Sequence, residues 1–308
     1  MKTKQILKKV VLACSILLMV VTSCNKDDNG GSKTPITEKG FITTWKTTVA
    51  NEEITITKDF NEGITTPYNY NVDWGDGNID NNVTESITHS YTTAGTHTVT
   101  ITGDFPAFNS GINPNAAKLI TVENWGSNIV WESMYQAFYQ CKNLTSINAT
   151  DSPNLGNNIT MYRMFYGATN FNSDISNWDV SNVTNMNYMF SYATNFNSDI
   201  SNWDVSNVTG MRNMFQNATN FNSDISGWDV SNVTNMSYMF HYATNFNIDI
   251  SNWDVSNVTG MDHMFHNAES FNQDLSAWET DNVTACNSFS VDSGLTNLNL
   301  PEGTCFNN

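Results

Sequence analysis

A 25-residue unit recurs five times in the second half of this 308-residue chain, and it restricts the possible folds more than any other feature. One copy runs from Asn185 to Thr209. Two rows of residues keep this spacing without a slip: Met161, Met186, Met211, Met236 and Met261, and Trp178, Trp203, Trp228, Trp253 and Trp278. A fixed period of this length predicts a solenoid whose units stack only on their neighbours. We therefore expect a long surface and no deep catalytic pocket.

Each unit divides into two halves with different patterns. In the first half Met186, Met189, Phe190 and Ala193 stand at positions i, i+3, i+4 and i+7, which predicts one buried face of a short helix. The second half suits a short strand and a turn at 200–205. We expect the solenoid to span 116–308, with degenerate N-terminal units at 116–159, regular repeats at 160–285 and a C-terminal cap at 286–308.

The segment at 1–23 has the pattern of a secretory signal peptide, with four lysines before an apolar run. The run ends in Val21-Thr22-Ser23-Cys24, which resembles the lipobox of bacterial lipoproteins. This resemblance implies a lipid on Cys24 that anchors the protein in a membrane; an ordinary cleavage site before a cysteine is the alternative. The residues at 25–28 resemble a signal that sends lipoproteins to the outer membrane, which implies a lipid-anchored protein facing the cell exterior.

The segment at 24–39 is rich in small and polar residues, so we expect a flexible tether there. From 40 to 106 apolar and polar residues alternate, which predicts strands. The motif Val72-Asp73-Trp74-Gly75-Asp76-Gly77, followed by His89-Ser90-Tyr91 and the segment at 94–99, resembles a PKD-type antiparallel β-sandwich. In that family the domain is a spacer or an interaction module. We expect Asp73 and Asp76 to bond turn backbone, although a cation is the alternative.

The net charge of the chain argues against one class of partner. The formal net charge is −17, and loss of the signal peptide removes four lysines and no acidic residue. Such a chain lacks the basic face that nucleic acids require.

Cys286 and Cys305 both lie close to the C-terminus, where a disulfide or two buried free thiols are both possible.

The repeat string M-F-x-x-A-x-x-F-N-x-D-I-S-x-W-D-V-S-N-V-T-x-M resembles that of BspA-type leucine-rich-repeat surface proteins of bacteria. The resemblance covers the chain from Tyr135 to near Asn308. It implies a multidomain cell-surface lipoprotein in which a β-sandwich precedes a short-helix, short-strand leucine-rich-repeat-like solenoid. It also implies a role in adhesion or host-protein binding and assigns no catalytic residue or cofactor.

Differences between the copies concentrate in the first half of each unit. The varying positions do not follow the buried spacing, so we expect them to face solvent, either as a binding face or as a surface free to drift. Residue types that suit protein recognition are frequent there. The candidate residues are Tyr162, Arg163, Tyr188, Tyr192, Arg212, Asn213, Tyr238, His241, Tyr242, His263 and His266.

Two invariant rows of aspartates require a structural explanation, because stacked like charges repel. One contains Asp174, Asp199, Asp224, Asp249 and Asp274, and the other contains Asp179, Asp204, Asp229 and Asp254. Hydrogen bonds to turn amides are the favoured interpretation and Ca²⁺ the alternative. A metal on the three histidines of the candidate face is a further, weaker possibility.

We therefore expect a non-enzymatic, lipid-anchored surface protein that presents its repeats to an extracellular or host protein. A structural spacer or coat protein without a specific ligand is the second hypothesis. A carbohydrate-related accessory protein is the third. No nucleophile–base pair or phosphate-binding loop supports an enzyme.

Overall fold

Antiparallel strands form the N-terminal part of the described chain. The computed structural model describes residues 40–60, 63–111, 113, 115–303 and 305–306. The predicted signal peptide, Cys24 and the tether at 24–39 lie outside the described residues. The strands are β1 (Phe41–Thr47), β2 (Glu52–Ile56), β3 (Asn69–Asp73), β4 (Ile79–Val83), β5 (Ile87–Tyr91), β6 (Gly95–Asp104), β7 (Leu119–Trp125), β8 (Ser146–Ile147), β9 (Ile159–Thr160) and β10 (Val183–Asn185).

Two sheets contain the strands of the N-terminal part. The larger has the order β4-β3-β6-β1-β7-β8, and β2 pairs with β5 in a second sheet. The region at 40–106, whose alternation predicts strands, contains β1 to β6. Trp45, Tyr70, Trp74 and Val99 are fully buried between these elements, because alternate residues of a strand point to the same face.

The turn after β3 depends on backbone geometry and on two aspartates, Asp73 and Asp76. Gly75 and Gly77 adopt φ of 76° and 93°, which favour glycine. Asp73 Oδ1 accepts a hydrogen bond from the Gly75 N–H at 2.9 Å, and Asp76 Oδ1 accepts one from the Asn78 N–H at 3.1 Å. Both carboxylates therefore bond turn backbone.

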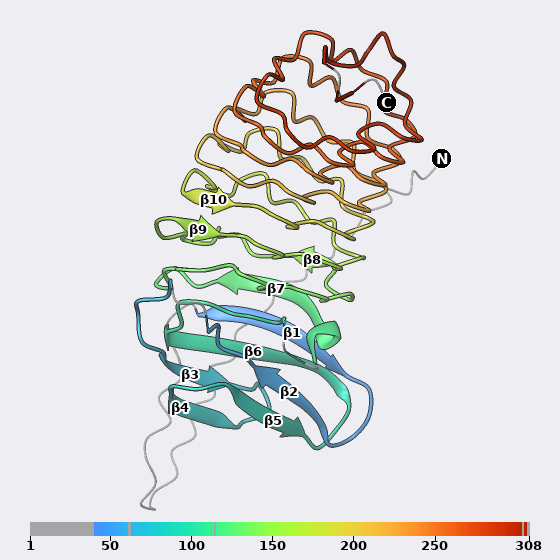
Figure 1. Ribbon diagram of the computed structural model, residues 1–308. Coiled ribbons are helices and arrows are strands. Elements are labelled where there is room, and N and C mark those ends of the chain that lie inside the picture. Colours follow the sequence, from blue (N-terminus) through green and yellow to red (C-terminus); the bar gives the residue numbers. More distant parts are fainter. Residues whose placement is uncertain (1–39, 61–62, 112, 114, 304, 307–308) are drawn as a thin grey trace, which may run out of the picture. The chain divides into compact units, whose positions relative to one another are not determined.

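The larger sheet leads directly into the repeats (Figure 1). Strand β7 pairs antiparallel with β1 and parallel with β8. Parallel pairing continues from β9 to β10 and then through isolated bridges that link Asn185, Gly210, Asn235, Gly260 and Ala285 in turn. Strand β7 lies within the region expected to hold degenerate repeats, yet it belongs to the sheet of the N-terminal part.

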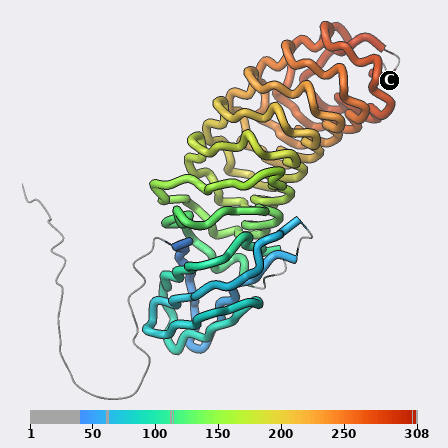
Figure 2. Tube along the Cα trace, turned by 90° about the vertical axis from the view of Figure 1, so that its left-hand side faces the viewer, coloured from blue at the N-terminus to red at the C-terminus, as the bar shows by residue number. Residues whose placement is uncertain are grey.

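The repeats form a stack that continues to the C-terminus (Figure 2). We refer to the repeats by their ranges 161–185, 186–210, 211–235, 236–260 and 261–285. Phenylalanine rings stack from each repeat to the next: Phe165, Phe190, Phe215, Phe240 and Phe265 have ring centroids 5.5–5.8 Å apart. Each also stacks on a second phenylalanine of its own repeat at 3.8–4.1 Å. A continuous aromatic core therefore runs through the stack.

The prediction of a short-helix, short-strand leucine-rich-repeat solenoid is wrong. Among the described residues the only helix is the single 3₁₀ turn η1 (Ala116–Lys118). The N–H groups that would close an α-helix bond instead to the next repeat: Tyr188 N–H donates to the Arg212 carbonyl at 2.8 Å, and Phe190 N–H to the Met214 carbonyl at 2.9 Å. The structure is almost entirely β and turn, in several small sheets.

The apolar spacing that predicted the helix has a different structural cause. Two consecutive turns produce it, closed by Met189 N–H to the Met186 carbonyl (3.2 Å) and by Ala193 N–H to the Phe190 carbonyl (3.0 Å). The four apolar residues at i, i+3, i+4 and i+7 are all fully buried. The sequence pattern thus identified the buried side chains correctly and assigned them the wrong backbone.

Candidate protein-binding face

The two turns that begin each repeat present a row of side chains on one side of the stack. We call this surface the turn face and define it by positions 162, 163, 166 and 167 and the equivalent positions of each later repeat up to 267. The third residue of each turn has a positive φ, as certain tight turns require. For the first turn these residues are Arg163, Tyr188, Asn213, Tyr238 and His263, with φ of 55–61°. Large side chains are therefore held on a left-handed backbone.

Hydrogen bonds between repeats fix the backbone of the turn face. Alternate N–H groups of one repeat donate to carbonyls of the next, as in Tyr192 N–H to Gln216 O (2.7 Å) and Tyr242 N–H to His266 O (2.9 Å). Because most of these groups are paired, the turns have little freedom to move individually. The side chains of the turn face therefore project from a rigid support.

The structure brings most of the predicted face residues together. Tyr192 and Tyr242 are 40% and 42% exposed, and Arg212 is also exposed. Partly buried members are Tyr162, Arg163, Tyr188, Tyr238, His241, His263 and His266. Asn213 is an exception: it is 5% exposed, and its Nδ2 donates to Gln216 Oε1 at 2.7 Å. Asn213 therefore orders the turns and offers little surface to a partner.

The N-terminal half of the turn face is a cluster of tyrosines around one arginine. The Arg163 guanidinium carbon lies 5.0 Å from the ring centroids of Tyr162 and Tyr188 and 5.7 Å from that of Tyr166. Burial raises the pKa of Tyr162 and of Tyr166, so both phenols stay neutral at pH 7. The Nε atom of Arg163 is buried and has no hydrogen-bond partner among the described residues.

The degenerate first unit extends this cluster, a feature that the sequence prediction missed. Tyr135 stacks on Tyr162 with centroids 5.3 Å apart, and Tyr139 stacks on Tyr166 at 5.0 Å. In both pairs the separation in sequence is slightly longer than one repeat, so neither Tyr135 nor Tyr139 falls on the regular period. Aligning M-Y-Q-A-F-Y with M-Y-R-M-F-Y places both tyrosines in the varying rows of the later repeats.

The C-terminal half of the face holds three imidazoles. The ring centroids of His241, His263 and His266 lie 5.1–6.1 Å apart, and Tyr238 stacks on His263 at 4.7 Å. Burial, together with the neighbouring imidazoles, lowers the pKa of His241 to about 4. Within the described part of the chain, no three histidine, cysteine, aspartate or glutamate side chains are arranged to hold a metal ion.

The aspartate rows lie outside the turn face, in the second half of each repeat. Asp204 Oδ1 accepts hydrogen bonds from the Ser206 hydroxyl at 2.6 Å and from the Ser206 N–H at 3.1 Å. These two bonds lower the pKa of Asp204, and Asp179 and Asp254 have the same kind of contacts. The carboxylates are thus solvent-exposed acceptors in local turns.

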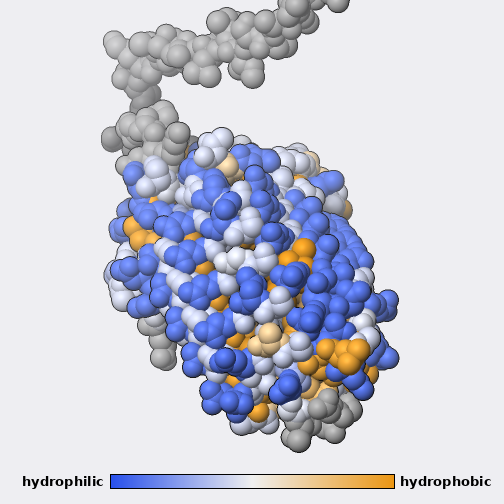
Figure 3. Space-filling model, turned by 90° about the horizontal axis from the view of Figure 1, so that it is seen from above, coloured by the Kyte–Doolittle hydropathy of each residue, from blue (hydrophilic) through white to orange (hydrophobic). Residues whose placement is uncertain are grey.

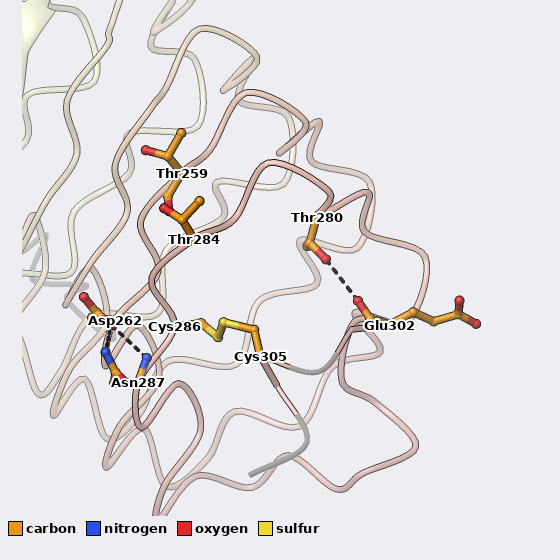
Figure 4. Close-up of a disulfide and its surroundings, with 8 residues drawn as sticks. All are labelled: Thr259, Asp262, Thr280, Thr284, Cys286, Asn287, Glu302 and Cys305. Atoms are coloured by element: carbon orange, nitrogen blue, oxygen red, sulfur yellow. Dashed lines mark hydrogen bonds between the residues drawn. A yellow bond between two sulfur atoms is a disulfide. The ribbon is translucent and has the colours of Figure 1, made fainter.

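A disulfide joins Cys286 to Cys305 at the end of the stack (Figure 4). Nearby, Thr280 Oγ1 donates to the Glu302 carbonyl at 3.1 Å, and Asn287 Nδ2 donates to Asp262 Oδ1 at 2.8 Å. The disulfide thus closes a loop within the C-terminal segment, and the two hydrogen bonds fasten that segment to the last repeat. Seen along the stack, the molecule presents a mostly hydrophilic surface with small apolar patches (Figure 3).

The repeats can now be compared with known proteins. A family model described as "Mycoplasma protein of unknown function, DUF285" matches residues 132–228 and 202–300. The chain belongs to this family. The DUF285 match begins at the first degenerate unit and includes the whole turn face, while β1 to β7 precede it.

The other comparisons found no significant match, neither with a curated protein nor with a solved structure. The resemblances to BspA-type repeats and to a PKD-type sandwich are therefore not confirmed. Membership of DUF285 assigns no activity to the turn face. None of the helices in the described part of the chain is long and apolar enough to cross a membrane.

Proposed function

We propose that the protein is a non-enzymatic surface protein whose turn face binds another protein. One observation carries the proposal: the positions that differ most between repeats gather on the turn face, while the buried Met, Phe and Trp positions repeat unchanged. A surface that varies on a constant support suits recognition, because contacts can change without loss of the fold.

The chemistry of the turn face favours a protein ligand. Tyrosine and arginine are enriched among the residues that dominate protein–protein binding energy. The only two arginines of the chain, Arg163 and Arg212, both lie on this face, and Arg212 is within 5.9 Å of the Tyr238 ring. In a chain of net charge −17 they place two positive charges on this face. We therefore favour a partner that offers acidic or aromatic side chains.

The location of the protein is part of the same proposal. The lipobox at 21–24 supports a lipid anchor on Cys24, and the residues at 25–28 support the outer membrane, with the repeats facing the exterior. The resemblance of the repeat string to BspA-type surface proteins supports the same location. A Cys24→Ser variant should appear in the soluble fraction, whereas the unchanged chain should stay with the membrane and be cut by protease added to intact cells.

The binding test uses the purified full chain and a panel of host extracellular matrix proteins and surface proteins of co-resident bacteria. A triple variant, Tyr188→Asn, Tyr192→Asn and Arg212→Ser, borrows residues found at the equivalent positions Asn213, Asn217 and Ser237. It should therefore fold while losing the partner. The matched control carries Asp199→Asn, Asp224→Asn and Asp249→Asn in the aspartate row, and it should keep the partner.

Two results would contradict the proposal. If the triple variant binds as well as the unchanged chain, then the turn face is not the binding surface. If no member of the panel binds the unchanged chain, then the second hypothesis, a spacer or coat protein without a specific ligand, is favoured.

A further inference from the structure

A groove lies where the N-terminal sheets meet the first repeats. It has a volume of about 670 Å³, and its lining includes Glu132, Tyr135, Asn157, Asn158, Thr160 and Tyr162. This volume is within the range of small-molecule sites, about 300–1,000 Å³. We call it the junction groove. It spans the first units of the stack and borders the turn face at Tyr162.

Side-chain amides dominate the polar lining of the junction groove. Asn157 and Asn158 are exposed, and no hydrogen bond to another described residue engages either amide. Asn185, also in the lining, uses its Oδ1 to accept the Asn187 N–H at 2.9 Å. Each amide offers donors and an acceptor side by side. That arrangement matches adjacent hydroxyl groups of a sugar, which both donate and accept.

The aromatic part of the lining is a stacked pair. The rings of Tyr135 and Tyr162 are nearly parallel, with an interplanar angle of 7°. Tyr135 is the first member of this stack, so among the described residues Tyr162 is the aromatic side chain that covers one of its faces. An open aromatic face is apolar and electron-rich and can pack against the C–H face of a pyranose ring.

The charge of the junction groove disfavours anionic ligands. The Glu132 carboxylate accepts hydrogen bonds from the Thr65 N–H at 2.5 Å, from the Thr66 N–H at 3.2 Å, and from both hydroxyls. Burial alone would raise the pKa of Glu132, but these bonds lower it overall, so the group is ionised at neutral pH. The described residues of the lining include no lysine, arginine or histidine. An anionic ligand would therefore meet one fixed negative charge and no cation from these residues.

We propose that the junction groove binds a short neutral oligosaccharide, with the ring of Tyr135 stacking on a sugar and the amides of Asn157 and Asn158 bonding its hydroxyls. This site goes beyond the protein-binding function proposed for the turn face. The two proposals can fail independently, because Tyr135 and Asn157 are outside the turn face and Tyr192 and Arg212 are outside the groove.

The test is isothermal titration calorimetry of the purified full chain with neutral probes and one anionic probe. The neutral probes are cellobiose, maltotriose, lactose and diacetylchitobiose, and the anionic probe is sialyllactose. At least one neutral sugar should bind with a Kd of about 1 mM or tighter. Sialyllactose should bind at least ~10-fold more weakly than that sugar, because of the Glu132 charge.

Variants then locate the site. Tyr135→Ala and Asn157→Asp should each weaken binding at least ~10-fold, whereas Tyr135→Phe should stay within ~3-fold because the ring is kept. Asn157 is exposed, so its substitution tests the groove without disturbing the core. The control Tyr192→Asn should leave sugar binding unchanged. Absence of binding by every neutral probe, tighter binding of sialyllactose, or unchanged affinity of Asn157→Asp would each overturn the proposal.

Discussion

The indole Nε1 of Trp203 donates a hydrogen bond to the backbone carbonyl of Ile175, 3.1 Å away in the preceding repeat. The contact recurs with lengths of 3.1–3.2 Å between each later tryptophan of the row and the repeat before it. Trp203 is only 3% exposed, so the bond satisfies the buried indole N–H, while the Ile175 carbonyl also accepts the Trp178 N–H at 3.2 Å. The tryptophan row thus joins neighbouring repeats.

Replacing this indole should weaken the stack. In Trp203→Phe a smaller ring replaces the indole and the N–H donor is lost, although the Ile175 carbonyl keeps the Trp178 N–H. The free energy of unfolding should therefore fall by about 1–3 kcal/mol. Trp203→Ala should cost more, about 3–5 kcal/mol, because a cavity is added. Urea unfolding followed by circular dichroism measures both, with Tyr192→Asn as the surface control. A loss below about 0.5 kcal/mol in Trp203→Phe would show that the hydrogen bond contributes little.

The turns of the repeats explain what the sequence could and could not predict. The apolar spacing identified the buried residues, since Met186, Met189, Phe190 and Ala193 are all fully buried. It could not reveal that Tyr188 has a φ of 60°, because tyrosine rarely adopts that conformation. Nor could it reveal that the N–H of Tyr188 bonds to a carbonyl of the next repeat, that of Arg212. This hydrogen bond to a distant residue replaces the local bond that a helix would need, and a local sequence pattern cannot show it.

Two glycines of the repeats should respond differently to substitution by alanine. Gly167 has a φ of 68°, and a Cβ there would lie 2.5 Å from Gln140 Nε2, whereas a Cβ at Gly227 would meet no heavy atom within 4 Å. Gly167→Ala should therefore lower the free energy of unfolding by about 1–2 kcal/mol through backbone strain. Gly227→Ala should be neutral or stabilising by up to about 1 kcal/mol. Thermal melting of the two variants compares them, and equal midpoints would contradict the assigned turn geometry.

The imidazoles of the turn face predict a pH dependence of stability. The pKa of His241 is about 4 in the folded chain, because burial disfavours its charged form, against an ordinary value of 6.5. The pKa of His266 is lowered for the same reason. Between pH 6.5 and about 4 the unfolded chain therefore binds more protons. The free energy of unfolding should therefore be highest above pH 6.5 and should decrease as the pH falls from 6.5 to about 4.

His241→Gln isolates the contribution of one imidazole, since Gln216 holds the equivalent position in the preceding repeat. On acidification, the free energy of unfolding should fall less in the variant than in the unchanged chain. The difference should be about 1 kcal/mol or less because His241 is partly exposed. Melting temperatures of the variant and of the unchanged chain, measured from pH 7.5 to pH 4, give the slope of stability against pH for each protein. Identical slopes would mean that His241 is protonated equally in the folded and unfolded chains.

The aspartate rows predict indifference to calcium. Asp199 Oδ1 accepts the Ser201 N–H at 2.9 Å, and Asp224 Oδ1 accepts the Ser226 N–H at 2.9 Å, so local turns already use these oxygens. Adding a chelator or millimolar Ca²⁺ should leave the melting midpoint within about 1 °C, because a ligand that does not bind the folded state cannot stabilise it. A rise of several degrees with Ca²⁺ would support the alternative interpretation of the rows.

The candidate face was predictable in outline and not in detail. Repeat-to-repeat variation located the rows that hold Arg163, Tyr192 and His266, and the structure gathers them on one surface. The burial of Asn213 was not predictable, because its amide is drawn inward by Gln216 in its own repeat. The first unit was recognised as a degenerate repeat, but its tyrosines were not included in the candidate face because an insertion shifts them off the 25-residue period.

The affinity of the turn face for its partner tests the central claim most directly. Arg163→Asn removes the guanidinium that contacts three tyrosine rings and introduces the residue found at Asn213, which adopts the same left-handed turn. Against a partner captured in the panel, the Kd of this variant should rise at least ~30-fold, the loss of about 2 kcal/mol expected of a central binding residue. The control Asp224→Asn should bind like the unchanged chain. Equal affinities for Arg163→Asn and the unchanged chain would contradict the claim that this cluster is the binding centre.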